Sequence, residues 1–167
     1  KEQLNYLVRK IISKDDYTWA KPNKRYLPQG LYLPSIYSEE IPLLAIALDS
    51  SGSISRDDLS GCASEVNEIF FQCRPKKLYV MYCDAKVHRV DEFERGDHIE
   101  FHPIGGGGTD FRPPFTYLKE NDIEPVCMIY LTDGKGVFPN EAPDYPVIWV
   151  IKNDSIISPH GITIHIN

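Results

Sequence analysis

The chain has 167 residues, of which 42% are hydrophobic and 25% are charged, and its formal net charge is −6. This size and composition are typical of one soluble globular domain that can bury a sizeable core. The acidic balance argues against nucleic-acid and anionic-membrane partners, because both select basic surfaces. No apolar run approaches the roughly 20 residues that span a bilayer, and no signal-peptide pattern opens the chain. Since the first residue is Lys1 and not Met, we expect the chain to be a piece of a longer protein.

Residues 1–41 differ in composition and hydrophobic pattern from the rest and are predicted to form a helix and a connector. Apolar residues between Leu4 and Ile12 follow helical spacing, which predicts a short amphipathic helix. Tyr17–Ser38 is rich in proline and tyrosine, and prolines at this density break helices and confine strands to edges. We predict an extended connector that lies against the following domain; the alternative is a partner-binding surface.

Residues 42–167 alternate between apolar runs and amphipathic stretches, which predicts a single α/β domain. The runs typical of buried strands are Leu43–Leu48, Leu78–Cys83 and Val126–Leu131. Two more strands are predicted over Val147–Ile151 and Ile162–Ile166. The shorter and more polar Val87–Phe93 is predicted to be an edge strand, and helices are expected over Leu59–Cys73 and Phe111–Leu118. Together they indicate an open, mostly parallel, Rossmann-like sheet flanked by helices. The short segment 134–146 leaves little room for a crossover helix, so the helical layer is expected to be trimmed.

Four cysteines lie within apolar patterns and show no Cys-x-x-Cys spacing: Cys62, Cys73, Cys83 and Cys127. We interpret them as buried thiols that act as small hydrophobic side chains. Free thiols are typical of a reducing compartment, so a cytoplasmic location is expected.

Five oxygen-bearing side chains follow predicted strands or a glycine-rich loop and are expected to converge. They are Asp49, Ser51, Ser53, Thr109 and Asp133. If the strands that precede the two aspartates are neighbours, the side chains meet at the carboxyl end of the sheet, where open α/β sheets bind ligands. Two carboxylates and three hydroxyls suit a hard ion such as Mg²⁺ or Mn²⁺ and disfavour zinc. The four glycines before Thr109 would let the chain turn sharply over the ion.

This pattern, which reads DSSGS, GGGGTDF and LTDG in chain order, resembles the metal-ion-dependent adhesion site of von Willebrand factor A domains. The resemblance covers roughly residues 42–167. It implies that Ser51, Ser53 and Thr109 ligate the ion directly, while Asp49 and Asp133 bind it or orient its water. It further implies a protein-interaction module whose bound Mg²⁺ or Mn²⁺ accepts an Asp or Glu side chain from a partner.

A second resemblance concerns the connector WAKPNKRYLPQGLYLPS together with the trimmed domain. Both are similar to the C-terminal part of a family of bacterial predicted metallopeptidases, whose His-Glu-x-x-His zinc site lies in the N-terminal part. None of the five histidines here is followed by Glu, so no such zinc site lies in this chain and no catalytic residue is assigned to it. The alternative function is therefore a regulatory or substrate-binding domain of such an enzyme. Related systems imply an AAA+ ATPase as partner class. A purely structural domain with a vestigial site is a third alternative, and whether the parent protein is an enzyme stays open.

Other polar residues receive plainer interpretations. Asp84 follows a predicted strand and could face the site, but we favour an ordinary turn residue at a strand end. His98 and His102 are four residues apart, yet Pro103 and the acidic surroundings favour a solvated loop over a metal-binding helix.

Overall fold

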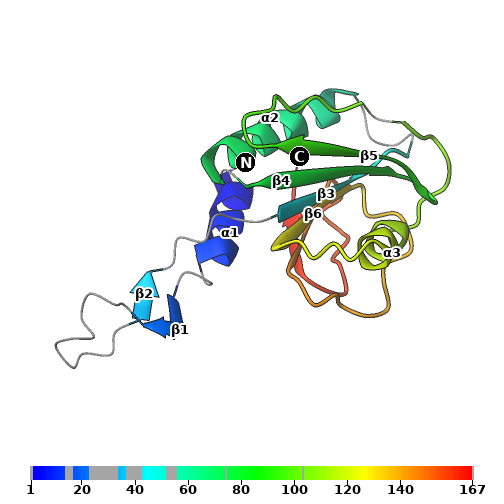
Figure 1. Cartoon of the computed structure of the whole chain (residues 1–167). Helices are drawn as coiled ribbons and strands as arrows, with labels where there is room; N and C mark the ends of the chain where they lie inside the picture. Colours follow the sequence, from blue (N-terminus) through cyan, green and yellow to red (C-terminus); the bar gives the residue numbers. More distant parts are fainter. Residues whose placement is uncertain are drawn as a thin grey trace.

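Six apolar or edge segments of the chain assemble into one sheet, shown in the computed structural model of Figure 1. The structure describes residues 2–13, 17–22, 34–36, 43–51, 56–73, 75–102 and 104–166. The strands of the sheet are β3 (Leu43–Asp49), β4 (Lys77–Cys83), β5 (Val87–Glu94), β6 (Cys127–Thr132), β7 (Val147–Ile151) and β8 (Ile162–His165).

The strand order is β5-β4-β3-β6-β7-β8, and every neighbouring pair runs parallel except β4 and β5. The predicted open, mostly parallel α/β sheet is therefore confirmed, with β5 as the expected edge strand. The central strand β3 pairs with both β4 and β6, so the two strands that precede Asp49 and Asp133 are neighbours. Their carboxyl ends meet at one edge of the sheet.

The sheet has a core on each face because alternate residues of a strand point to opposite sides. On one face, Leu44, Ile46 and Leu48 of β3 belong to a cluster that includes Val66 of α2 (Arg56–Cys73) and Val8 of α1 (Glu2–Ser13). The predicted N-terminal helix is thus confirmed, and its apolar stripe packs into this core.

The opposite face is covered by α3 (Pro113–Glu120) and by irregular segments (Figure 1). Ala45 and Ala47 of β3 face this side, where their small side chains leave room for a group of aromatic rings. The helix begins at Pro113, which suits the first helical turn because proline lacks the N–H that would stay unpaired there.

The connection from β6 to β7 contains no helix, as the short segment 134–146 predicted. Phe138 from this segment covers the sheet instead. Its ring centroid lies 4.8 Å from that of Phe111 and 4.9 Å from that of Trp149. These edge-to-face contacts bury apolar area where a crossover helix would otherwise pack.

The connector predicted over residues 17–38 is described only at its ends, which are β1 (Tyr17–Pro22) and β2 (Pro34–Ile36). These strands pair antiparallel, and Figure 1 shows this small sheet standing apart from the six-stranded sheet. These ends satisfy their main-chain hydrogen bonds with each other. That the connector lies against the domain stays a prediction, because most of residues 17–38 fall outside the described residues.

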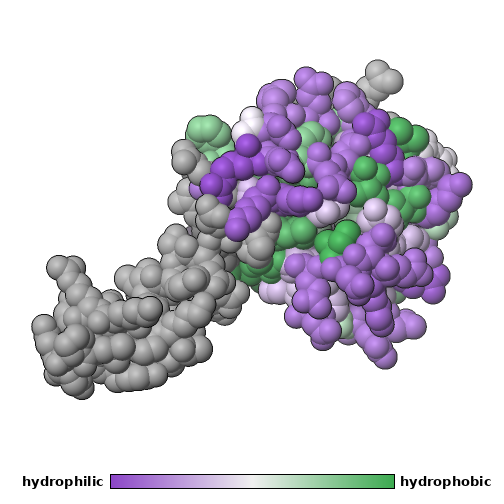
Figure 2. Space-filling model, in the orientation of Figure 1, coloured by the Kyte–Doolittle hydropathy of each residue, from purple (hydrophilic) through white to green (hydrophobic). Residues whose placement is uncertain are grey.

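The described surface in the view of Figure 2 is largely hydrophilic, and hydrophobic side chains lie between charged ones. Such mixing is normal for a folded domain. No described helix is long and apolar enough to cross a membrane.

Candidate metal centre

Three neighbouring parallel strands end at one edge of the sheet and carry polar residues there. β3 ends at Asp49, β6 at Thr132, and β4 at Cys83, which is followed by Asp84. In Figure 1 this is the edge at which β4 turns into β5. A polar set at the carboxyl ends of strands is the arrangement by which open α/β sheets bind ligands.

Asp49 is only 1% exposed, and both of its carboxylate oxygens accept hydrogen bonds. Oδ1 accepts the main-chain N–H of Ser51 at 2.9 Å, and Oδ2 accepts the hydroxyl of Thr132 at 2.7 Å. The second bond crosses from β3 to β6. Because each carboxylate oxygen has a further lone pair, Asp49 can hold an ion or its water while its orientation is fixed.

The two residues after Asp49 are held in the turn that follows β3. The hydroxyl of Ser50 donates to the carbonyl of Cys83 at 3.0 Å and so turns toward β4, while Ser51 is buried. Ser53, the third member of the motif, lies outside the described residues.

Asp133 is buried directly after β6, and its Oδ1 accepts the main-chain N–H of Lys135 at 2.9 Å. No described residue donates a hydrogen bond to its Oδ2. The turn depends on Gly134, which has φ of 81° and whose missing Cβ would lie 2.9 Å from Cγ2 of Ile151. A side chain at this position would therefore push the turn away from the sheet.

Thr109 stands beside the segment that follows Asp133. A Cβ on Gly136 would lie 2.8 Å from Cγ2 of Thr109, so these two segments of the chain are in close contact. The next residues extend this contact, since Asp110 forms a bridge with Val137 and Phe111 N donates to Val137 O at 3.0 Å. The structure thus places Thr109, half-buried, next to the loop of Asp133.

Comparison with known proteins identifies the family. A family model described as a VWA-like domain (DUF2201) matches residues 44–167. The chain belongs to this family. An uncharacterized protein of Thermotoga maritima is 30% identical over 124 residues, which are 74% of the chain and 30% of that protein. The chain therefore spans less than a third of the length of this relative.

The fold of this VWA-like domain also matches a solved structure. The crystal structure of the ArnB paralog VWA2 from Sulfolobus acidocaldarius aligns with a TM-score of 0.54 at 18% identity. The alignment covers 68% of the chain and 35% of that protein. The expected resemblance to von Willebrand A domains is thus confirmed at the level of family and fold. The adhesion site and the relation to metallopeptidases stay predictions.

The residues at this edge of the VWA-like domain have the donor chemistry of a magnesium-type site. Asp49 and Asp133 supply carboxylate oxygens, and Ser51 and Thr109 supply hydroxyls, a set that suits hard cations. No three His, Cys, Asp or Glu side chains in the described part of the chain gather as a metal-binding cluster. A site with two carboxylates and neutral hydroxyls does not need such a cluster.

Asp84, at the same edge, makes hydrogen bonds that the sequence did not predict. Its carboxylate accepts Gly107 N at 3.1 Å, Lys86 N at 3.2 Å and His88 Nε2 at 2.8 Å. Burial raises the pKa of Asp84, but the hydrogen bonds to its carboxylate outweigh that effect and lower the pKa to about 2. Asp84 makes a turn, as favoured, but it also contacts the glycine loop. Its place after a strand beside that of Asp49 was the signal available in the sequence.

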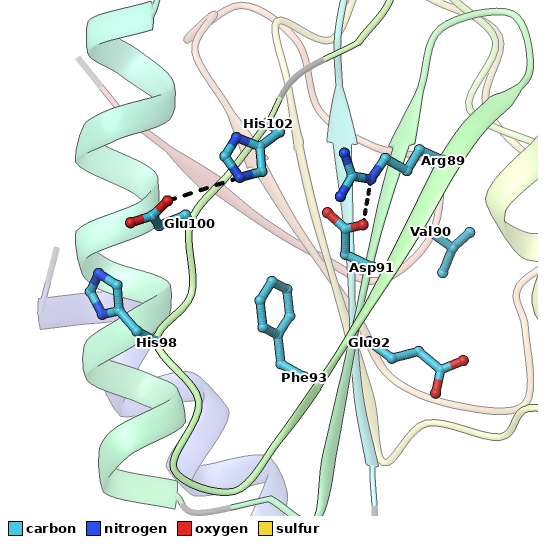
Figure 3. A pocket seen from close by; sticks show the side chains of 8 residues that line it. All are labelled: Arg89, Val90, Asp91, Glu92, Phe93, His98, Glu100 and His102. Atoms are coloured by element: carbon cyan, nitrogen blue, oxygen red, sulfur yellow. Dashed lines mark hydrogen bonds and ion pairs between the residues drawn. The ribbon is translucent and has the colours of Figure 1, made fainter.

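A second polar cluster lies between β5 and residues 98–102 (Figure 3). Arg89 there pairs with Asp91, and His102 Nε2 lies 3.9 Å from Glu100 Oε2. His98 and His102 are exposed in an extended segment, which confirms that they do not form a helical metal-binding pair. The charged side chains therefore pair along the surface and do not converge on one point.

Proposed function

We propose that this VWA-like domain is a divalent-metal-dependent protein-interaction module. In this proposal Mg²⁺ or Mn²⁺ is held by Asp49, Ser51, Ser53, Thr109 and Asp133, and it accepts an Asp or Glu side chain from a partner protein. The observation that carries the proposal is the arrangement of the two aspartates after adjacent strands, with Asp49 oriented by the Thr132 hydroxyl.

The balance of charges favours binding of an acidic partner. Five side chains fill at most five positions of an octahedral shell, so a partner carboxylate can take the sixth. The ion also keeps positive charge if either aspartate binds it only through water. The whole chain carries a formal net charge of −6 and would repel an acidic partner without the ion. We therefore expect binding of the partner to depend strictly on the metal.

The thiol at this edge is unsuited to act as a nucleophile. Burial raises the pKa of the Cys83 thiol to about 12, so the thiol stays protonated near neutral pH. Hydrolysis would need a base or nucleophile within reach of a substrate, and this thiol does not supply one.

The test is titration of the chain with Mg²⁺ and Mn²⁺ by calorimetry, beside Asp133→Ala and the conservative Asp49→Asn. Wild type should bind one ion, and both variants should lose most of the heat while circular dichroism shows a native fold. The control is Asp144→Ala, because Asp144 is exposed in the same β6–β7 connection. Absence of binding by wild type at millimolar ion would reject the metal role and favour a structural domain with a vestigial site.

Metal dependence of partner binding needs a second measurement. Peptides that bear one Glu or the matched Gln should be compared in Mg²⁺ and in EDTA. The proposal expects binding only for Glu peptides in Mg²⁺. An AAA+ ATPase is the partner class to which the same comparison should first be applied.

The alternative function is a regulatory or substrate-binding domain of a metallopeptidase whose zinc site lies outside this chain. It is favoured by the observation that the aligned segment is only 30% of the Thermotoga maritima relative. Assays of casein hydrolysis by this chain and by the full-length parent separate the two functions. Hydrolysis by the parent alone would support the alternative, and hydrolysis by this chain would contradict both.

A further inference from the structure

Asp84, directly after β4, is hydrogen-bonded to the loop that carries Thr109 on both sides of that residue. Oδ2 of Asp84 accepts the N–H of Gly107 at 3.1 Å, two residues before Thr109. Its main-chain carbonyl accepts the N–H of Asp110 at 3.0 Å, one residue after Thr109. The chain on both sides of Thr109 is therefore held at the end of β4.

Two glycines of the loop lie in close contact with the residues that end β3 and β4. A Cβ on Gly107 would lie 3.0 Å from Oδ2 of Asp84. A Cβ on Gly105, where φ is 154°, would lie 2.2 Å from the hydroxyl oxygen of Ser50. Glycines loosen a chain unless contacts order them, so the hydrogen bonds to Asp84 supply the order that the loop sequence lacks.

The Asp84 carboxylate is itself fixed in orientation. Oδ1 accepts Lys86 N at 3.2 Å and His88 Nε2 at 2.8 Å, which leaves Oδ2 directed at the loop. Asp84 is only 6% exposed, so water competes little for these bonds.

We propose that Asp84 is a positioning residue for the metal centre, which sets the place of the Thr109 hydroxyl through the main chain of the glycine loop. Asp84 is not among the five candidate ligands. Its role rests on the proposed function, because Thr109 needs a fixed position only if it contributes to an ion site. Residues that orient ligands typically change metal affinity 10- to 100-fold when they are replaced.

The primary test is the affinity of the chain for Mn²⁺ alone, with wild type beside Asp84→Asn. The Asn side chain has an NH₂ group in place of one carboxylate oxygen of Asp84. Because this group donates and cannot accept, the variant loses a hydrogen bond either to Gly107 N or to Lys86 N. We expect Mn²⁺ binding to weaken about 10- to 100-fold. The matched control is Asp97→Asn, because Asp97 also accepts a main-chain N–H in a turn, that of Glu94 at 2.7 Å, but outside the glycine loop. The control should bind Mn²⁺ as wild type does.

Two further variants separate position from charge. Asp84→Glu keeps the charge but moves the carboxylate by one methylene. Gly107→Ala keeps Asp84 but places a Cβ 3.0 Å from its Oδ2, so that the carboxylate or the loop must shift. Both should weaken Mn²⁺ binding about 10-fold or more. Wild-type affinity in either of them, beside weak binding in Asp84→Asn, would show that Asp84 acts by its charge and would overturn the proposal.

Amide hydrogen exchange without metal provides a readout that does not depend on the ion. The N–H groups of Gly107 and Asp110 should exchange at least about 10-fold faster in Asp84→Asn, while those of β3 and β6 stay slow. Unchanged exchange in the loop, or Mn²⁺ affinity within twofold of wild type, would overturn the proposal. Failure of wild type to bind Mn²⁺ would instead reject the proposed function, even if Asp84→Asn speeds exchange in the loop.

Discussion

The hydrogen bond from Thr132 to Asp49 makes a sharp prediction about stability. Thr132 is 3% exposed, and its hydroxyl donates to Oδ2 of Asp49 at 2.7 Å while it accepts Gly134 N at 3.0 Å. Thr132→Val keeps the shape of the side chain and removes both bonds. Valine is favoured in strands, so any loss of stability comes from the missing hydroxyl.

The expected size follows from the two bonds. A hydrogen bond to a charged group contributes about 1.5–3 kcal/mol and a neutral one about 1 kcal/mol. The buried methyl group of valine recovers about 0.8 kcal/mol. We therefore expect Thr132→Val to lower the free energy of unfolding by about 2–3 kcal/mol, or the melting temperature by about 4–12 °C.

The assay is urea unfolding in EDTA, so that bound metal does not contribute. Thr132→Ser keeps the hydroxyl and should recover most of the stability. Thr116→Val is the control, since the exposed Thr116 hydroxyl makes only a 3.4 Å bond to Arg112 O. A loss below about 0.5 kcal/mol in Thr132→Val, or an equal loss in the control, would refute the reasoning because surface substitutions typically stay within that range.

Four further outcomes can be checked. Gly136→Ala would place a Cβ 2.7 Å from the ring of Phe111 and should cost about 1–3 kcal/mol in thermal unfolding. Gly61→Ala in α2 meets nothing within 4 Å and should stabilise the domain by about 0.5–1 kcal/mol in the same assay. The pKa of Asp84 is about 2 in the folded chain and ordinary when unfolded, so its contribution is complete above about pH 5 and disappears as pH falls through 2. Acid titration of unfolding should show this loss in wild type and not in Asp84→Asn. The Cys83 thiol, with its pKa raised by burial to about 12, should resist alkylation at pH 8 until the chain unfolds, as peptide mass spectrometry can measure.

The strands and the position of the candidate site could be predicted because the sequence signals are local. Apolar runs such as Leu43–Leu48 mark strands that are buried on both faces, and the polar residue after each run marks its carboxyl end. The short segment 134–146 correctly predicted a missing crossover helix. The sequence predicted that Asp49 and Asp133 meet only if the strands before them are neighbours, and the pairing of β3 with β6 shows that they are.

The contacts that hold the site could not be predicted, because they depend on distances across the fold. Thr132 reaches Asp49 only because β3 and β6 are in register, with Leu48 opposite Leu131. Asp84 contacts Gly107 only because the glycine loop folds back over the end of β4. The pairing of β1 with β2 was missed for a different reason, since the prolines in both segments favoured an extended connector over paired strands.

The two sides of the candidate site differ in how firmly the fold holds them. Asp49 and Asp133 follow central strands, and hydrogen bonds of paired strands open rarely. Thr109 follows four glycines and depends on side-chain contacts such as that of Asp84. If the loop is ordered in only a fraction of molecules, the apparent affinity for the ion falls by the same fraction. A partner carboxylate that binds the ion would favour the ordered state, so binding of metal and partner should strengthen each other most where the loop is loosest. Asp84→Asn should therefore weaken binding of the ion alone more than binding of the ion in the presence of a Glu peptide.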